Sequence, residues 1–169
     1  MNTQSLDAIP KSRAFRVEVC ESLSRSPLFK DWSWDELDTL SSYMAGYRAL
    51  AGAMLFEEGD AGDSMGLLLS GQIEVRKNDV AGVAQCVGTI VAGRTFGEMA
   101  AIDGENRSAA CVTTEPCVLA LLPKSQFDRI LMVNEALGTK LLLRVTKLLS
   151  QRLREVNGTL VDFLSKDAT

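Results

Sequence analysis

A run of short apolar or alternating segments, separated by glycine-containing turns, limits the fold more than any other feature of this sequence. The segments lie between about residues 47 and 123 and read GLLLSG, QIEVRK, AQCVGTIV, AACVTTE and CVLALLP. The turns contain Gly59, Gly62, Gly71, Gly82, Gly93 and Gly104. Short strands with a turn signal about every 8–12 residues are typical of a β-sandwich, a β-barrel or a jelly roll. The region is therefore predicted to be all-β, and the segment NDVAG at residues 78–82 is predicted to connect a hairpin.

The residues before this region carry helical patterns. Apolar side chains recur every four residues between positions 11 and 23, at Phe15, Val19 and Leu23. This spacing predicts a first helix. Ser33 followed by Glu36 has the pattern of a capping box, which predicts that a second helix begins there.

Two further helices are predicted after Pro123. The first is short and is expected to have Ser125 near its N-cap. The second runs roughly from Asn134 to Leu164, because apolar residues advance by threes and fours at Leu142, Val145, Leu149, Leu153, Val156, Leu160 and Phe163. In its first half the apolar surface is widened by Leu137, Leu141, Leu143 and Leu148, so we expect that half to pack on the β-region. In its second half the stripe narrows to a seam, which favours burial against a second copy; packing within one chain is the alternative.

Length and charge set broad limits. The 169 residues suffice for one well-filled core and are too few for two comfortable domains. The net charge of −4 gives no overall field that favours nucleic acid. The first residues, MNTQSLDAIPKSR, lack the apolar segment of a signal peptide. No stretch approaches the roughly 18 apolar residues that cross a bilayer, so we expect a soluble cytoplasmic protein.

Cysteine and histidine content excludes several kinds of site. Cys20, Cys86, Cys111 and Cys117 match no zinc or iron–sulfur spacing, and the last three lie in strand-like segments where free cysteine is typical of a core. The chain has no histidine. This removes His-based metal and haem sites, and Ser–His or Cys–His nucleophilic pairs. We therefore expect no metal site, no cofactor and no enzyme.

These patterns predict one domain over residues 11–169 after a disordered N-terminus, residues 1–10. Within the domain, helices are expected at 11–45, the β-region at 46–123 and the C-terminal helices at 124–164.

The segment FGEMAAIDGENRSAA, residues 96–110, places several ligand-binding residue types close together. Gly97 would let the backbone approach a ligand, and Glu98 would begin a short helical turn whose free N–H groups attract an anion. Arg107 can bind two phosphate oxygens with its planar fork, and Ser108 adds a hydroxyl. If Glu98 accepts from a neutral hydroxyl, the segment fits a ligand in which a sugar and a phosphate are close together. The alternative is a loop salt bridge between Glu98 and Arg107, which would contribute only about 0–1 kcal/mol.

This segment resembles the phosphate-binding cassette of cyclic nucleotide-binding domains, whose usual form is Phe-Gly-Glu-hydrophobic-Ala, a short spacer, and Arg followed by Ser, Thr or Ala and then Ala. Upstream, EEGDAGDSMGLLLSGQIEV is similar to the paired glycine motif of that family, with Gly59 and Gly71 at the expected places. The resemblance runs from roughly Leu23 to Leu160. It implies an α+β fold that is mainly β: an eight-stranded antiparallel β-roll, or jelly roll, with N-terminal helices and a long C-terminal helix.

The resemblance also implies a ligand and its contacts. Arg107 would bind the cyclic phosphate of cAMP or cGMP, and Glu98 the ribose 2′-hydroxyl. The full set of implied ligand-binding residues is Phe96, Gly97, Glu98, Met99, Ala100, Arg107, Ser108 and Ala109. The choice between cAMP and cGMP stays open, with cAMP preferred. Three positions depart from the family pattern: Asn106 replaces a proline, Ala101 a leucine, and Gly66 an aromatic residue whose loss is expected to loosen a strand or open space.

In the family, the helix after the roll closes over the base and carries the signal. Only five residues follow Leu164, too few for a helix-turn-helix, so direct DNA binding is not expected despite the similarity to the sensor half of Crp/Fnr-type regulators. The expected function is a stand-alone receptor that acts through a protein partner or a homodimer. Three alternatives remain: a scaffold without a nucleotide, a cyclic-dinucleotide receptor (for which Arg94 is the one extra arginine near the mouth), and a cupin-like enzyme, which the absence of histidine disfavours.

Overall fold

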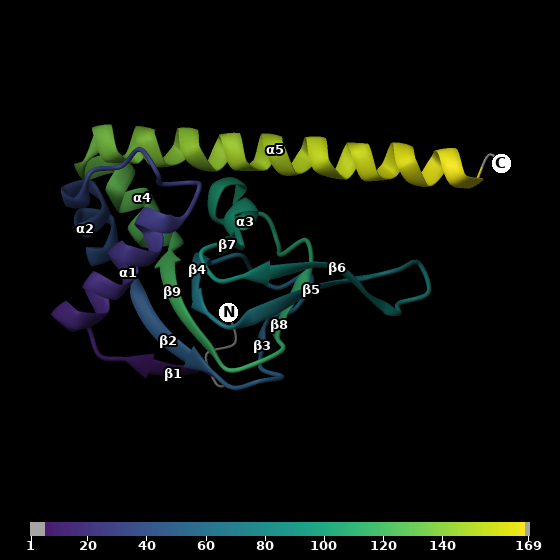
Figure 1. The fold of residues 1–169 in the computed structure, drawn as a ribbon, viewed down its shortest axis with the longest axis horizontal. Helices are drawn as coiled ribbons and strands as arrows, with labels where there is room; N and C mark the ends of the chain where they lie inside the picture. Colours follow the sequence, from purple (N-terminus) through teal and green to yellow (C-terminus); the bar gives the residue numbers. More distant parts are fainter. Residues whose placement is uncertain (1–5, 168–169) are drawn as a thin grey trace.

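The computed structural model describes residues 6–167 and places a β-roll beneath a long C-terminal helix (Figure 1). The five helices within that range are α1 (Arg13–Arg25), α2 (Trp34–Ser42), α3 (Glu98–Asp103), α4 (Lys124–Val133) and α5 (Glu135–Asp167). The strands are β1 (Leu6–Ile9), β2 (Ala45–Ala49), β3 (Met54–Phe56), β4 (Ser64–Ser70), β5 (Gln72–Asn78), β6 (Ala84–Val91), β7 (Thr95–Phe96), β8 (Ala110–Thr113) and β9 (Cys117–Pro123). The α+β, mainly β fold class predicted from the sequence is confirmed.

The strands form two antiparallel sheets. One has the order β1-β2-β9-β4-β7 and the other β3-β8-β5-β6. The strands β2 to β9 are the eight of the expected roll. The hairpin predicted at residues 78–82 joins β5 to β6, where Asp79 accepts from the backbone N–H groups of Ala81 and Val83.

The strand β1 differs from the disorder expected for residues 1–10. Residues 6–9 pair with β2, with Leu6 opposite Ala49 and Ile9 opposite Gly46. The side chain of Leu6 is buried in the core of the roll, so the pairing gains apolar contact as well as hydrogen bonds. The expectation is therefore wrong for residues 6–9, and residues 1–5 lie outside the described range.

The first two helices form where the sequence predicts them. Apolar spacing is confirmed in α1, where Phe15, Val19 and Leu23 are all buried. The capping box is confirmed at α2: Ser33 N–H donates to Glu36 Oε2 over 2.7 Å, and Glu36 N–H donates to Ser33 Oγ over 3.3 Å. In both helices a serine side chain therefore accepts from a backbone N–H group of the first turn.

The short helix predicted directly after Pro123 is α4, and Ser125 lies near its N-cap, in the first turn. The N-cap residue is Pro123, which makes no side-chain capping bond. The backbone N–H of Lys124 instead donates to the carbonyl of Asp63 over 2.7 Å. The chain therefore passes directly from β9 into α4.

The core has two parts that lie on opposite faces of the five-stranded sheet. Alternate residues of β9 show this: Ala120 and Leu122 pack with the helices, whereas Leu119 and Leu121 pack inside the roll. Such alternation follows from the two-residue period of a strand. The helices thus cover one face of this sheet, and the second sheet covers the other.

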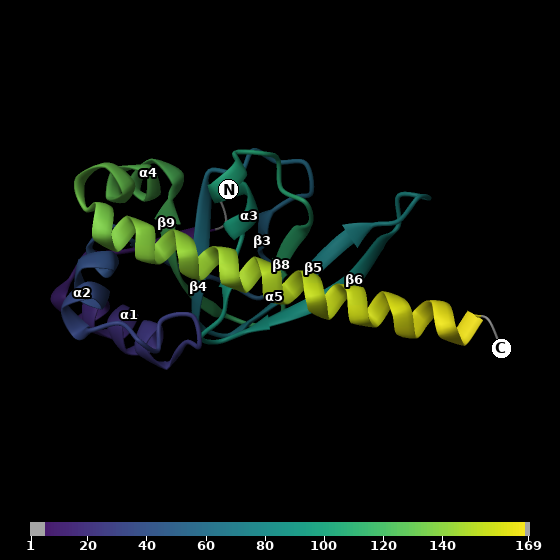
Figure 2. The same ribbon diagram turned by 90° about the horizontal axis from the view of Figure 1, so that it is seen from above.

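Only one part of α5 packs on the rest of the chain. Leu137, Leu141 and Val145 are buried, as expected, but Leu143 is 57% exposed, so the predicted widening of the packed surface is wrong there. Further along, the apolar residues are more than half exposed at Leu153, Val156, Leu160, Val161, Phe163 and Leu164. Figure 2 shows that this end of α5 extends beyond the helices and most of the roll.

The cysteines follow the sheet structure. Cys111 and Cys117 are buried, as is Cys20 in α1, but Cys86 is exposed. Its strand, β6, is the edge of the four-stranded sheet, so the expectation of a core role for Cys86 is wrong. Among the described helices, none has the length and apolar character of a membrane span.

Candidate functional site

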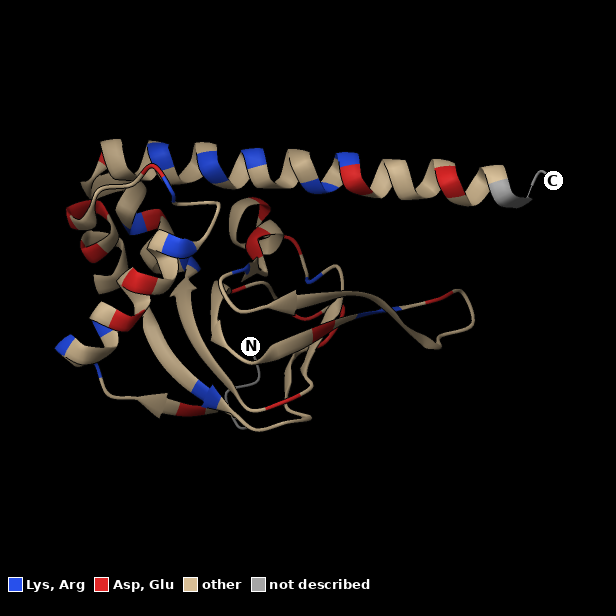
Figure 3. Ribbon diagram, viewed as in Figure 1, with Lys and Arg blue, Asp and Glu red and all other residues tan. Residues whose placement is uncertain are grey.

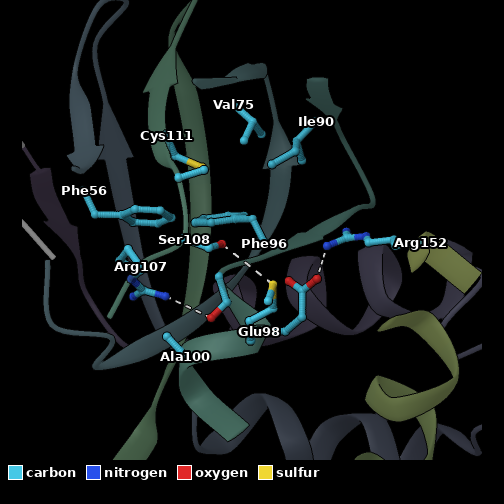
Figure 4. A pocket seen from close by; sticks show the side chains of 13 residues that line it. Phe56, Val75, Ile90, Phe96, Glu98, Ala100, Arg107, Ser108, Cys111 and Arg152 are labelled. Carbon is cyan, nitrogen blue, oxygen red and sulfur yellow. Dashed lines mark hydrogen bonds and ion pairs between the residues drawn. The ribbon is translucent and has the colours of Figure 1, made fainter. Parts of the chain in front are cut away.

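All eight residues of the predicted binding set line one cavity of about 190 Å³ (Figure 4). They are Phe96, Gly97, Glu98, Met99, Ala100, Arg107, Ser108 and Ala109. The sequence analysis did not include five other lining residues, Phe56, Val75, Ile90, Cys111 and Arg152. The cassette is thus one part of a cavity to which the sheets and α5 also contribute.

A glycine turn begins the cassette. After Phe96, Gly97 has a φ of 69° and precedes α3, the short helix that the sequence predicted. A Cβ atom at Gly97 would lie 2.5 Å from Nη1 of Arg107. Both the positive φ and the close approach therefore require glycine, and its carbonyl accepts from Arg107 Nη1 over 2.9 Å.

Arg107 is a buried cation at the base of the cavity, with 3% of its surface exposed. Its Nη2 atom lies 3.3 Å from Ser64 Oγ and 3.4 Å from Asp63 Oδ1, and its guanidinium lies 4.2 Å from the ring centroid of Phe56. Within residues 6–167, its buried Nε has no hydrogen-bond partner. Burial lowers the pKa of Arg107, and the charge of Asp63 opposes that shift. Arginine nevertheless remains charged at neutral pH, so the group has an unused donor.

The loop that carries Arg107 is tied to the first glycine of the paired motif. Gly59 N–H donates to the carbonyl of Arg107, and Arg107 N–H donates to that of Asp60, both over 2.8 Å. On the other side, Lys77 Nζ donates to the carbonyl of Ser108 over 2.6 Å and to Glu58 over 2.9 Å. The paired motif therefore positions the cassette through the backbone.

Glu98 is a buried carboxylate, 1% exposed, and its partner is Arg152 of α5. Oε1 of Glu98 accepts from Nη1 of Arg152, while Nη2 of Arg152 donates to the carbonyl of Thr95 over 2.9 Å. The salt bridge considered between Glu98 and Arg107 is therefore replaced by one to the C-terminal helix. Oε2 of Glu98 is buried and has no partner among the described residues.

Arg152 was missed as a site residue because it lies 54 residues after Glu98 in the sequence. Burial lowers the pKa of Arg152, and so does the nearby charge of Arg94, while Glu155 opposes the shift. The sequence did contain one indication of this role. Arg152 is a cation on the helix that, according to the family resemblance, closes over the ligand.

The rest of the cavity is mainly apolar. The rings of Phe56 and Phe96 are stacked with centroids 6.3 Å apart. Burial raises the pKa of the Cys111 thiol to about 12, so this lining residue is neutral at physiological pH. At the mouth, Ser108 Oγ lies 3.8 Å from Sδ of Met99, which is half exposed. The cavity can therefore hold a ligand that has an anion, a hydroxyl and a flat apolar part.

The departure at Gly66 has a steric explanation. A Cβ atom at Gly66 would lie 2.3 Å from the ring of Phe96. The glycine makes room for Phe96, so the expectation of open space is wrong. Of the other departures, Asn106 is exposed and Ala101 is fully buried against the helical core.

Comparison with known proteins agrees with the fold. Residues 48–134 match the family model of the cyclic nucleotide-binding domain. A crystal structure of a cyclic nucleotide-binding domain from Methylobacillus flagellatus has a TM-score of 0.85 and 33% identity, over 95% of this chain and 91% of that one. The Thermus thermophilus catabolite activator protein has a TM-score of 0.73 and 29% identity, over 83% of this chain and 63% of that one.

Two curated relatives are longer proteins. The cyclic AMP receptor protein of Thermus thermophilus is 29% identical over 83% of this chain and 62% of its own length. A cAMP-dependent protein kinase regulatory subunit of Blastocladiella emersonii is 31% identical over 73% of this chain and 31% of its own length. The chain thus spans less than two thirds of either relative.

Proposed function

This chain belongs to the cyclic nucleotide-binding domain family, and we propose that it is a receptor for cAMP or cGMP with a regulatory role and no catalytic one. The observation that carries the proposal is a pair of unused polar atoms in one cavity. Nε of the buried Arg107 lacks an acceptor, and Oε2 of the buried Glu98 lacks a donor, among the described residues. Unpaired buried polar atoms are costly, and a ligand that supplies an anion and a hydroxyl would satisfy both.

The cyclic phosphate is assigned to Arg107. Its guanidinium is buried beside Gly97, where the absence of a Cβ lets the backbone and the ligand come close. A charge-assisted bond in such a buried place is stronger than one at the surface. Ser108 and Ala109 line the same cavity and are assigned to the phosphate or the base.

The ribose 2′-hydroxyl is assigned to Oε2 of Glu98. A carboxylate can only accept, so its counterpart must be a donor such as a sugar hydroxyl. The base is assigned to the apolar part of the cavity, where Phe56, Val75 and Ile90 provide a surface for a flat ring. Phe96, Met99 and Ala100 complete the lining next to the sugar and phosphate.

The signal is assigned to α5. Arg152 places this helix in contact with Glu98, so a ligand at Glu98 and the position of α5 affect one another. A ligand shifts such an equilibrium only by the difference in its affinity for the two states. The exposed apolar residues from Leu153 to Leu164 would then be presented to a protein partner or a second copy. We place residues 6–167, from β1 to the end of α5, in one domain.

A cyclic dinucleotide is the second candidate. The observation that favours it is the presence of Arg152 in the cavity wall, with the charge of Arg94 nearby. Two more arginines near the mouth could bind a second phosphate. A nucleotide-free scaffold is disfavoured, because it leaves the two buried polar atoms without a role.

The test is calorimetric titration of the protein with cAMP, cGMP and a cyclic dinucleotide. The Arg107→Ala variant should lose about thirtyfold or more in affinity, which corresponds to about 2–5 kcal/mol for a buried charged contact. Arg129→Ala is the matched control, because Arg129 is exposed on α4 and does not line the cavity. Circular dichroism shows whether each variant is folded. Absence of binding by the wild type to all three ligands would refute the proposal.

A further inference from the structure

A second cavity shares Arg152 with the cavity that contains the cassette. Its volume is about 330 Å³, and it is bounded by residues 26–28, by the turn before β7, and by α5. Its lining residues are Ser26, Pro27, Leu28, Arg94, Thr95, Arg144, Lys147, Leu148, Gln151 and Arg152. The functions assigned above use this cavity only through the contact of Arg152 with Glu98 and, for the cyclic dinucleotide alternative, through Arg152 and Arg94.

The lining of this basic cleft has four cations and no carboxylate. That composition is notable in a chain whose net charge is −4. Two of the cations are already paired: Arg144 with Asp31, over 2.6 Å, and Arg152 with Glu98. The other two, Arg94 and Lys147, make no ion pair with any described residue. The cleft therefore has positive charge that the protein does not neutralise.

The cations converge from two elements. Arg144, Lys147 and Arg152 lie on α5, where Figure 3 shows Lys and Arg recurring along the part of the helix that passes over the roll. Arg94 comes from the turn between β6 and β7, directly after Gly93. Its charge acts on Arg152 and contributes to lowering the pKa of that guanidinium, after the larger effect of burial. Like charges that are held close together without a counter-ion repel one another, and an anion removes that repulsion.

We propose that this basic cleft is a second ligand site, which binds a small molecule through a phosphate or pyrophosphate group. Guanidinium forks match phosphate oxygens in pairs, and Lys147 adds a mobile point charge at the rim. The anion would connect α5 to the turn before β7 and hold the helix over the roll. Arg152 has five N–H donors and uses two in the contacts with Glu98 and Thr95, so it can reach the anion without leaving Glu98.

The test is calorimetric titration with inorganic pyrophosphate at low ionic strength, where surface charge is least screened. The test variant is Arg94→Gln together with Lys147→Gln. Both side chains are exposed and unpaired, so their replacement should not unfold the protein. The matched control is Arg154→Gln together with Arg129→Gln, which removes the same number of positive charges from exposed positions outside the cleft. The test variant should lose about tenfold or more in affinity, whereas the control should stay within about twofold of the wild type.

A third variant, Arg107→Ala, separates the two cavities, because pyrophosphate could also enter the cassette. Pyrophosphate binding that survives Arg107→Ala and is lost in the test variant supports the cleft. Binding that is lost with Arg107→Ala and kept in the test variant places the anion in the cassette and overturns the proposal. An equal loss in the control shows a non-specific effect of charge and overturns the proposal, as does an absence of binding by the wild type. None of these outcomes depends on whether cAMP or cGMP binds.

Discussion

Arg152 on α5 pairs with the buried carboxylate of Glu98, which begins α3 in the cassette. Glu98 is 1% exposed, and the side chain of Arg152 is 39% exposed, so the pair is reached by solvent from one side only. The contact joins the longest helix to the binding loop. It is the direct structural connection between the proposed ligand and the proposed output.

Arg152→Gln should destabilise the protein by roughly 1–3 kcal/mol, because it leaves a buried carboxylate without its cation. The free energy of unfolding in urea measures the effect, with Arg154→Gln as the control for charge loss on the same helix. Combining Arg152→Gln with Glu98→Gln should recover part of the loss, because the buried group is then neutral. Additive losses in the double variant would show that the pair does not act as a unit.

Gly97→Ala should destabilise the fold by more than about 1 kcal/mol and weaken nucleotide binding. The positive φ is unfavourable for alanine, and the new Cβ would meet Nη1 of Arg107 at 2.5 Å. Gly82→Ala separates these causes, because Gly82 has a similar φ of 78° and open space around it. Thermal unfolding should show a larger loss for Gly97→Ala. Equal losses would mean that the backbone strain alone matters.

Gly66→Ala should destabilise the protein by about 1–3 kcal/mol through overpacking, because its Cβ would lie 2.3 Å from the ring of Phe96. Gly88→Ala is the control, since Gly88 also lies in a strand and has nothing within 4 Å. Phe96→Leu replaces the ring with a smaller side chain and should therefore reduce the destabilisation caused by Gly66→Ala. Chemical unfolding of the wild type, the variants Gly66→Ala and Phe96→Leu, and their double variant measures this coupling. Absence of coupling would contradict the steric explanation.

The thiols should differ sharply in reactivity. At pH 8 a thiol reagent should modify Cys86 quickly and Cys20, Cys111 and Cys117 slowly, because only Cys86 is exposed. Cys86→Ser should remove the fast phase. Two fast thiols in the native protein would contradict the burial of the other three.

Stability should also fall at alkaline pH, with Cys111 as one cause. Burial raises the pKa of this thiol from an ordinary value of 9.0 to about 12 in the folded chain, so the unfolded chain loses its proton first. The stabilisation is therefore complete below pH 9 and is lost as the pH rises toward about 12. Urea unfolding between pH 8 and pH 10 should give a smaller decline for Cys111→Ala than for the wild type. An unchanged decline would show that other groups control it.

The exposed end of α5 should mediate association. Leu160→Glu should shift a concentration-dependent dimer toward monomer in sedimentation experiments, because it places charge in an apolar seam. Thr159→Glu is the neighbouring control. A wild type that is monomeric at all concentrations would favour a different protein as the partner.

The sequence predicts those parts of the structure that depend on neighbouring residues. The helix of Phe15, Val19 and Leu23, the capping box of Ser33 and the hairpin after Asn78 are set by spacing over a few positions. Other features depend on contacts between distant segments. The pairing of Leu6 with Ala49 and the exposure of Cys86 follow from which strands become neighbours or edges.

The candidate site divides in the same way. The cassette from Phe96 to Ala109 is contiguous, so its pattern predicts that its residues lie together. The apolar wall and Arg152 come from five further elements, and no local pattern connects them with Glu98. The family resemblance pointed to α5, yet only the three-dimensional packing identifies which cation of that helix reaches the carboxylate.

The contact between Gly66 and Phe96 links the packing of the sheet to the binding loop. The ring of Phe96, on β7, fills the space that a side chain at position 66 of β4 would need. A larger residue at position 66 would therefore have to displace that ring. Because Phe96 directly precedes Gly97, the displacement would also reach the first residues of the binding loop.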